Sequence, residues 1–195
     1  LDITCRMSNQ SLEAGAAGSN LKVYTPGTWQ GDGFDEMYNI GGSNNNGTNI
    51  GTNTLSVGLF AASSTISFNI TCTATLGGVA IPVAGLVVAD AEASAGTEYT
   101  GIRTATPSNF HVIDGINLCA ASTPPKIGTF TTQAAVTGGT ELRLVNPNGN
   151  CEVASTGSKT GPALVGYLDN TNTAKFVVRG GGNSAIAVGA IVQFD

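Results

Sequence analysis

The residues whose types and spacing could do chemistry are carboxylates in two short stretches. Asp32, Asp35 and Glu36 fall within five positions of a segment that reads W-Q-G-D-G-F-D-E-M-Y-N-I-G-G. Asp90 and Glu92 follow an apolar run and are separated by one residue. In a strand, two such side chains project from the same face, and their mutual repulsion is costly unless they lie in water or around a cation. Both stretches are therefore candidate sites.

Calcium is one ligand that these carboxylates could share. It takes about six to eight oxygens from carboxylates, amides and backbone carbonyls, and Asn39 and the glycine-rich backbone could add some of them. The spacing of an EF-hand is absent, so the site would be assembled from separate segments. The calcium hypothesis assigns the metal to four carboxylates, Asp32, Asp35, Asp90 and Glu92.

Two other uses of the same carboxylates stay open. Asp32 and Asp35 could cap turns by accepting backbone N–H bonds, while Asp90 and Glu92 pair with Arg103 or Lys22. Alternatively, two carboxylates could form a glycosidase-like pair across a scissile bond, which requires a cleft.

A binding surface is the further expectation for the acidic segment. Trp29 is the only tryptophan, and it could stack on a sugar or peptide, or plug one end of the fold. The candidate ligand-binding residues are accordingly those of this one segment: Trp29, Asp32, Asp35, Glu36 and Asn39.

The elements that must position these residues are strands. The chain has 27 glycines, a charged fraction of 11% and a polarity that comes from Ser, Thr and Asn, as in extracellular β-proteins. Leu1–Met7 alternates as a half-buried strand does, and Thr65–Thr75 places Ile66, Phe68 and Ile70 on one face. No window shows helical periodicity. We therefore expect one all-β domain over residues 1–195, an antiparallel two-sheet β-sandwich of lectin-like or jelly-roll type.

Charge and motifs exclude several function classes. A net charge of −5 and a low pI argue against nucleic acid and anionic membrane surfaces as partners. No apolar stretch is long enough to insert into a bilayer. His111 stands alone in a probable strand and no G-x-S-x-G motif accompanies it, so we expect a structural or surface histidine and no catalytic residues.

Four cysteines indicate two disulfides and hence an oxidising, extracellular compartment. The spacing does not fix their connectivity. Cys5 and Cys72 both fall in strand-like runs, so we expect the pairs Cys5–Cys72 and Cys119–Cys151.

Four blocks of sequence carry a family resemblance. They are T-P-G-T-W-Q-G-D-G-F-D-E-M-Y-N-I-G-G at Thr25–Gly42, T-C-T-A-T-L-G-G at Thr71–Gly78, I-P-V-A-G-L-V-V-A-D-A-E-A-S at Ile81–Ser94 and G-G-G-N-S-A-I-A-V-G at Gly180–Gly189. In this order they resemble the second non-repetitive domain of CshA-type bacterial surface adhesins. The resemblance implies a lectin-like β-sandwich on a large cell-surface protein, and no catalysis.

The expected function is therefore that of an extracellular ligand-binding module on a cell surface. Its partner would be a glycan or an extracellular protein, bound by loops at one end of the sandwich, and the isolated domain would be monomeric within its larger chain. Two alternatives remain open: a structural spacer without a ligand, and a secreted carbohydrate-active enzyme.

Overall fold

The computed structural model describes residues 1–24, 57–90, 97–116, 129–145, 151–153, 158–160, 163–181 and 183–194. Nearly all of this backbone lies in β-strands, and every strand pairing is antiparallel. One short 3-10 helix, η1 (Pro107–Asn109), precedes β8. No helix of the described residues is long and apolar enough to span a membrane.

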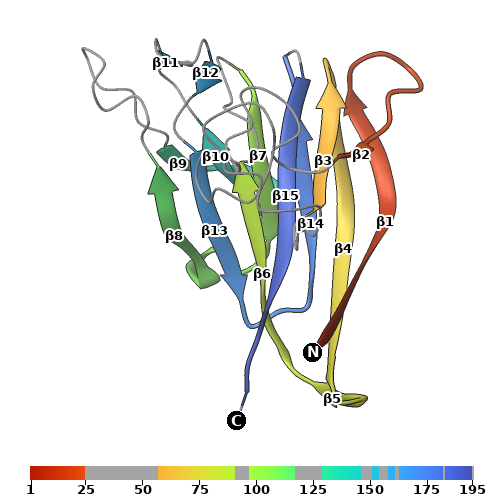
Figure 1. The fold of residues 1–195 in the computed structure, drawn as a ribbon. Coiled ribbons are helices and arrows are strands. Elements are labelled where there is room, and N and C mark those ends of the chain that lie inside the picture. Colours follow the sequence, from red (N-terminus) through yellow and green to blue (C-terminus); the bar gives the residue numbers. More distant parts are fainter. Residues whose placement is uncertain are drawn as a thin grey trace.

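Two sheets pack against each other (Figure 1). Sheet A has the strand order β1-β4-β14-β7-β10-β9, and β5 pairs with β4 on the edge opposite β1, beyond the start of β14. Its strands are β1 (Asp2–Ala14), β4 (Thr65–Leu76), β5 (Val79–Ile81), β7 (Tyr99–Thr104), β9 (Thr129–Val136), β10 (Gly139–Val145) and β14 (Thr173–Arg179).

Sheet B has the strand order β2-β3-β15-β6-β13-β8. Its strands are β2 (Lys22–Tyr24), β3 (Val57–Ala62), β6 (Val83–Asp90), β8 (Phe110–Ile116), β13 (Ala163–Asp169) and β15 (Asn183–Val192). A separate two-stranded ribbon joins β11 (Cys151–Val153) to β12 (Ser158–Thr160). The expectation of two antiparallel sheets is confirmed.

The core lies between the two sheets and follows from the alternation of β4. Ile66, Phe68 and Ile70 are all buried on one face of this strand, as its sequence predicts. The Phe68 ring stacks on Phe176 of β14, with ring centroids 5.9 Å apart. Sheet B contributes its own buried set, including Leu86 of β6. Together these side chains form one continuous apolar cluster.

The apolar run of β6 is buried on both faces of sheet B. Leu86 and Val88 belong to the core, and Ala89, on the opposite face, is also fully buried. Val165 of β13 and Ala187 of β15 lie beside Ala89 in register and are buried as well.

Strand β1 differs from its prediction. It is longer than Leu1–Met7, and its residues are exposed instead of half-buried. The reason is its place at the edge of sheet A, where the core-side residues Ile3 and Met7 remain 42% and 45% exposed. A disulfide between Cys5 and Cys72 fastens this edge strand to β4, as predicted. By the chain-entropy argument, closing a loop of 67 residues stabilises the fold by about 4 kcal/mol.

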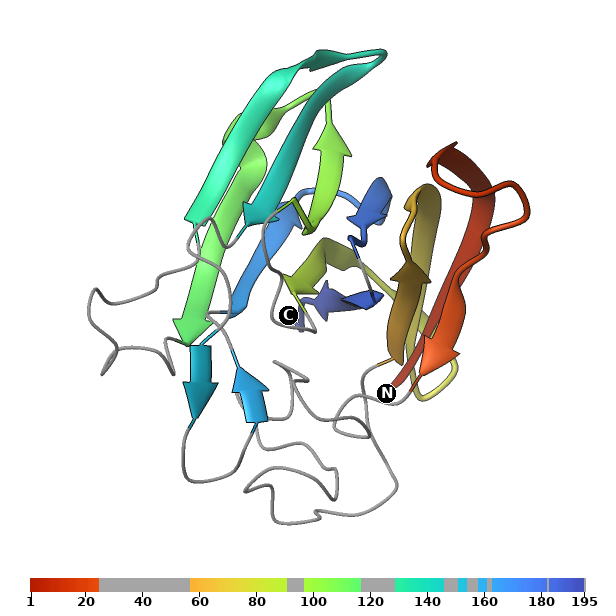
Figure 2. The same ribbon diagram turned by 90° about the horizontal axis from the view of Figure 1, so that it is seen from above.

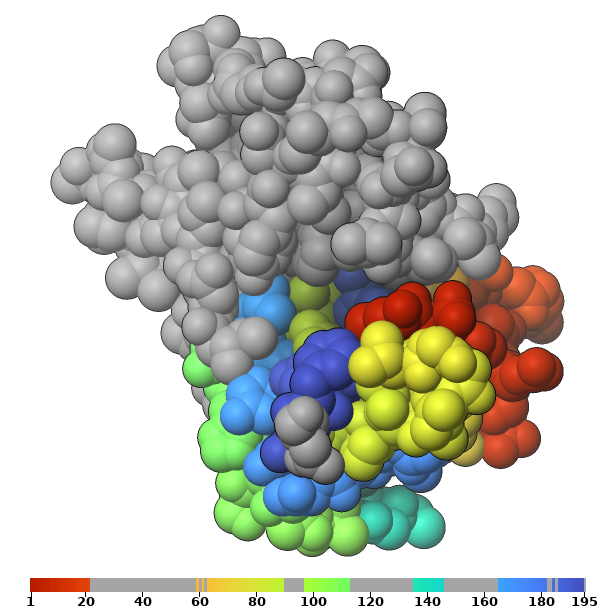
Figure 3. Space-filling model, turned by 60° about the horizontal axis from the view of Figure 1, so that its bottom comes forward, coloured from red at the N-terminus to blue at the C-terminus, as the bar shows by residue number. Residues whose placement is uncertain are grey.

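Three connections cross between the sheets at one end of the sandwich, the lower end in Figure 1. They link β5 to β6, β7 to β8 through η1, and β13 to β14. The β13–β14 connection is a short turn that is hydrogen-bonded to β4 of sheet A. The Cys72 amide donates to the Asn172 carbonyl at 2.8 Å, and the Asn172 side chain donates to the Cys72 carbonyl. Figure 3 shows this end of the molecule, with β1 and the β4–β5 hairpin at its surface.

Candidate functional site

The candidate site is the outer face of sheet A, the face that points away from sheet B. Because side chains alternate along a strand, the neighbours of the core residues Phe176 and Ile102 point outward. Five of the chain's eight lysines and arginines occupy such positions. They are Arg6 of β1, Arg103 of β7, Arg143 of β10, and Lys175 and Arg179 of β14.

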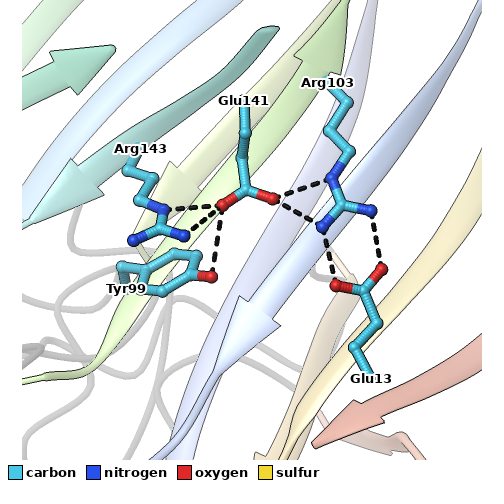
Figure 4. A network of polar contacts seen from close by, with 5 residues as sticks. All are labelled: Glu13, Tyr99, Arg103, Glu141 and Arg143. Carbon is cyan, nitrogen blue, oxygen red and sulfur yellow. Dashed lines mark hydrogen bonds and ion pairs between the residues drawn. The ribbon is translucent and has the colours of Figure 1, made fainter. Parts of the chain in front are cut away.

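A buried carboxylate organises part of this face (Figure 4). The side chain of Glu141 is 1% exposed and accepts hydrogen bonds from two arginines and a tyrosine. Arg103 Nε donates to one carboxylate oxygen at 2.7 Å, and Arg143 Nε donates to the other at 2.6 Å. The Tyr99 hydroxyl donates to Glu141 Oε1 at 3.2 Å. The charge of Glu141 is therefore compensated on both oxygens.

The guanidinium of Arg143 lies over the ring of Tyr99, with 3.8 Å from Cζ to the ring centroid. This is cation–π distance, so the arginine is fixed by the ring below it as well as by Glu141. The hydrogen bonds of Arg143 to Glu141 use Nε and Nη2. Among the described residues, no acceptor contacts its Nη1, so Nη1 has donors available to a ligand.

The second arginine, Arg103, connects this cluster to the far edge of the sheet. Its Nη1 and Nη2 donate to the two carboxylate oxygens of Glu13 at 2.6 and 2.7 Å, a bidentate pair. Glu13 belongs to β1, and two strands, β4 and β14, lie between β1 and β7. On a flat sheet β1 and β7 would be about 14 Å apart, so the contact between Glu13 and Arg103 requires sheet A to bend. Figure 2 shows the bend, with β1 and the β9–β10 hairpin on the two sides of this face.

The middle of the bent face is closely filled. Val177 of β14 points outward beside Gly101, yet it is fully buried, as is Ser67 on β4. A side chain at Gly101 would bring a Cβ to 2.6 Å from the Leu142 carbonyl oxygen, so glycine is required there. The long side chains of Arg103 and Glu13 can reach over this floor because nothing projects from Gly101.

Electrostatics fix the ionisation of this cluster. The hydrogen bonds from Arg103 hold the pKa of the Glu13 carboxyl below its usual value. The same bonds raise the pKa of Arg103, whose charge is permanent at any physiological pH. Burial, followed by the nearby charge of Glu141, raises the pKa of the Tyr99 hydroxyl to about 12. The cluster thus presents fixed charges and a neutral phenol at neutral pH.

Two open hollows flank the β13–β14 turn at the end of this face. One, of about 490 Å³, lies between Thr73 of β4, Ile81 of β5 and Asn172. The other, of about 290 Å³, lies between Arg103, Asn109 and Thr173. Hydroxyl and amide groups supply much of both linings, and Arg103 connects the second hollow to the charged face.

The carboxylates predicted from the sequence are not brought together by the described residues. The segment with Trp29, Asp32, Asp35, Glu36 and Asn39 lies outside them, as does Glu92. Asp90 is the last residue of β6 in sheet B, and its backbone is in register with Ile186 of β15. The calcium hypothesis therefore remains a hypothesis. No group of three potential metal ligands occurs within the described part of the chain.

Of three other sequence-based expectations, only the one for His111 concerns described side chains alone. Arg103 pairs with Glu13 and Glu141, but the side chains of Asp90 and Glu92 lie outside the described residues, so their expected pairing with Arg103 or Lys22 stays a prediction. His111 is exposed and stacks on Tyr167, with 4.9 Å between ring centroids, in agreement with a structural histidine. The proposed pair Cys119–Cys151 cannot be compared, because residue 119 lies outside the described residues.

The family model for surface adhesin CshA non-repetitive domain 2 matches residues 1–192. The chain belongs to this family. No curated protein and no solved structure matches it. Membership makes the chain a domain of a surface adhesin, and it associates the charged face with a protein class whose work is attachment. The blocks that indicated the family lie partly outside the described residues, whereas the charged face lies within them.

Sequence reasoning missed most residues of this adhesin domain's charged face. Glu13, Tyr99, Glu141 and Arg143 drew no attention because they are scattered over the chain. One local signal was present: Glu141 and Arg143 alternate in a strand-like segment, which places opposite charges on one face. The other contacts depend on the strand order, which the sequence does not specify.

The outer face offers a stable set of hydrogen-bond donors. All three guanidinium nitrogens of Arg103 contact carboxylates, so its role is to hold the bend. Arg6, Lys175 and Arg179 form no ion pair with another residue in the described ranges. Of these, Arg6 and Lys175, with Nη1 of Arg143, can bind an external acceptor, whereas Arg179 lies at the other end of β14, beside Thr65 and Tyr99.

Proposed function

We propose that this adhesin domain is a ligand-binding module that attaches its parent protein to a glycan or an extracellular protein. One observation carries the proposal: a bent sheet face, not covered by the opposite sheet, presents fixed polar groups and cations that have no ion-pair partner among the described residues. Family membership supports attachment as the role of the domain. The outer face of sheet A supplies a surface on which attachment can occur.

The geometry favours binding over a purely mechanical role. The side chains of Arg103, Glu141 and Arg143 are already ordered by mutual contacts, so little conformational entropy is lost when a ligand arrives. A spacer domain needs no ordered donors on its surface. The open hollows beside the β13–β14 turn add concave surface next to this face.

This proposal places the ligand on a sheet face, whereas the sequence suggested loops with Trp29 and its neighbouring carboxylates. The two locations can be separated by experiment. The purified domain should be applied to a glycan array and to a panel of extracellular-matrix proteins, with and without a chelator. Arg143→Gln tests the face and Trp29→Ala tests the acidic segment.

We expect the wild type to bind at least one member of these panels, and Arg143→Gln to weaken that binding. Arg143→Gln keeps a polar but shorter side chain without the charge, and circular dichroism should confirm that the sheet is intact. Binding that survives Arg143→Gln but is lost in Trp29→Ala would move the site to the acidic segment. Absence of binding to every panel member at high surface density would favour a spacer.

A further inference from the structure

Six polar residues form two rows at the end of the outer face next to the β13–β14 turn. Each row crosses β1, β4 and β14. In the first row Arg6 pairs with Thr71, which pairs with Thr173. In the second row Ser8 pairs with Asn69, which pairs with Lys175. We call these six residues the polar patch.

The rows share one face because residues directly opposite each other, and residues two apart on a strand, project to the same side. That side is the outer one, since Ile70 and Phe176, which alternate with the patch residues, are buried in the core. Thr71 and Thr173 are exposed, and Lys175 is half-buried. The patch is therefore accessible to a ligand.

The two cations of the patch stand at diagonal corners. Arg6 and Lys175 are two strands and two residues apart, which separates their Cα atoms by roughly 12 Å. Neither forms an ion pair with another residue of the described segments. Long, flexible side chains at that spacing can converge on one anionic group or bind two on the same ligand.

The carboxylates nearest the patch on this face are already neutralised. Glu13 is bound by both Nη atoms of Arg103, and Glu141 is bound by two arginines. Lys175 lies close enough to Glu13 to contribute to the lowering of its pKa without forming an ion pair. An arriving anion therefore meets two available cations on a protein whose net charge is −5.

The residues between the cations suit a sugar better than a peptide. The hydroxyls of Thr71 and Thr173 are 2.8 Å apart, so one donates to the other and the pair retains a donor and lone pairs for a ligand. Asn69 adds an amide. None of the six patch residues is aromatic or aliphatic, whereas protein interfaces depend on aromatic anchors in their centres. The chemistry is that of a hydroxyl-rich ligand carrying acid groups.

We propose that the polar patch binds an acidic glycan, with its carboxylate or sulfate groups on Arg6 and Lys175 and its hydroxyls on Asn69, Thr71 and Thr173. This inference rests on the proposed function and names the class of its ligand. The hollow beside Thr173, lined also by Asn109 and Thr171, offers room for the next sugar of the chain.

The test is an array of matched pairs: sialyllactose with lactose, and chondroitin sulfate with chondroitin that has been both desulfated and carboxyl-reduced, which leaves it neutral. The double variant Arg6→Gln/Lys175→Gln removes both charges from accessible positions. Arg179→Gln is the matched control, because it removes one exposed charge from the same face of the same strand, away from the patch. Thermal unfolding of each variant monitors the fold.

The wild type should bind an acidic member at least about tenfold more tightly than its neutral counterpart, and the double variant should lose roughly that factor. Arg179→Gln should stay within about twofold of the wild type. Equal binding of acidic and neutral members, or equal losses in the control and the double variant, would overturn the inference. If the wild type binds only neutral glycans or proteins, the acidic ligand is wrong but attachment stands. If it binds nothing, both proposals fall.

Discussion

Arg103 of β7 donates hydrogen bonds from both Nη atoms to the carboxylate of Glu13 of β1, across two intervening strands of the same sheet. The pair connects the edge of sheet A to its middle and holds the bend that shapes the outer face. Arg103 Nε simultaneously donates to Glu141, so one guanidinium connects the edge strand to the buried carboxylate. The charged face is thus a single connected network.

The Glu13–Arg103 pair makes stability depend on acidic pH. The pKa of Glu13 is lowered from 4.5 in the folded protein, so its contribution is fully present above that value and is lost as pH falls through the folded pKa. Denaturant unfolding should show the wild type losing more stability below about pH 4.5 than Glu13→Gln does. At neutral pH the two should differ by only about 1 kcal/mol, because the pair is partly exposed. Identical pH profiles would contradict this role.

Glu141 should contribute far more than Glu13 to the free energy of unfolding. Replacing it by glutamine leaves Arg143 without a charged acceptor and Arg103 with Glu13 alone, around a side chain that is 1% exposed. Removing one partner of a buried charge network costs about 3–5 kcal/mol, so Glu141→Gln should be destabilised by that order. Chemical denaturation of both variants at neutral pH compares them directly. A loss for Glu141→Gln no larger than that for Glu13→Gln would show that the network is dispensable.

Tyr99 gives the opposite pH dependence. Its pKa is raised from 10.0 to about 12, so the stability associated with its neutral form is complete below pH 10.0 and declines as pH rises toward 12. Tyr99→Phe lacks this ionisation. In unfolding experiments over that range the wild type should lose stability relative to Tyr99→Phe, and phenolate absorbance should show a late-titrating tyrosine that Tyr99→Phe lacks. Parallel stability curves for the two proteins would count against the burial of this hydroxyl beside Glu141.

The calcium hypothesis makes a separate prediction about the acidic segment. If calcium bridges Asp32 and Asp90, its binding to the folded state raises the melting temperature of the wild type. We expect added calcium to stabilise the wild type, a chelator to reverse the effect, and the Asp32→Asn/Asp90→Asn double variant to show neither change. Magnesium at equal concentration is the control for ionic strength. If calcium does not change the melting temperature of the wild type, turn capping is the remaining role for these carboxylates.

The strands could be predicted from the sequence more fully than the site could. Alternation in Thr65–Thr75 gave the core face of β4 correctly, because period 2 is a local property. The same alternation misjudged β1, since exposure there depends on its position at the edge of the sheet. The three-residue strands β11 and β12 carry too short a pattern to be recognised. The charged face escaped prediction because strand order, a long-range property, brings Glu13 to Arg103.

The location of the ligand tests the central claim most directly. Backbone amide resonances of the domain should be followed by solution NMR while the tightest-binding array glycan is added. Binding on the outer face of sheet A predicts that the perturbed amides cluster on β1, β4 and β14, around Arg6, Thr71 and Lys175. Perturbations confined to residues 25–56 and 91–96, with these strands unaffected, would contradict the claim and place recognition at the acidic segments.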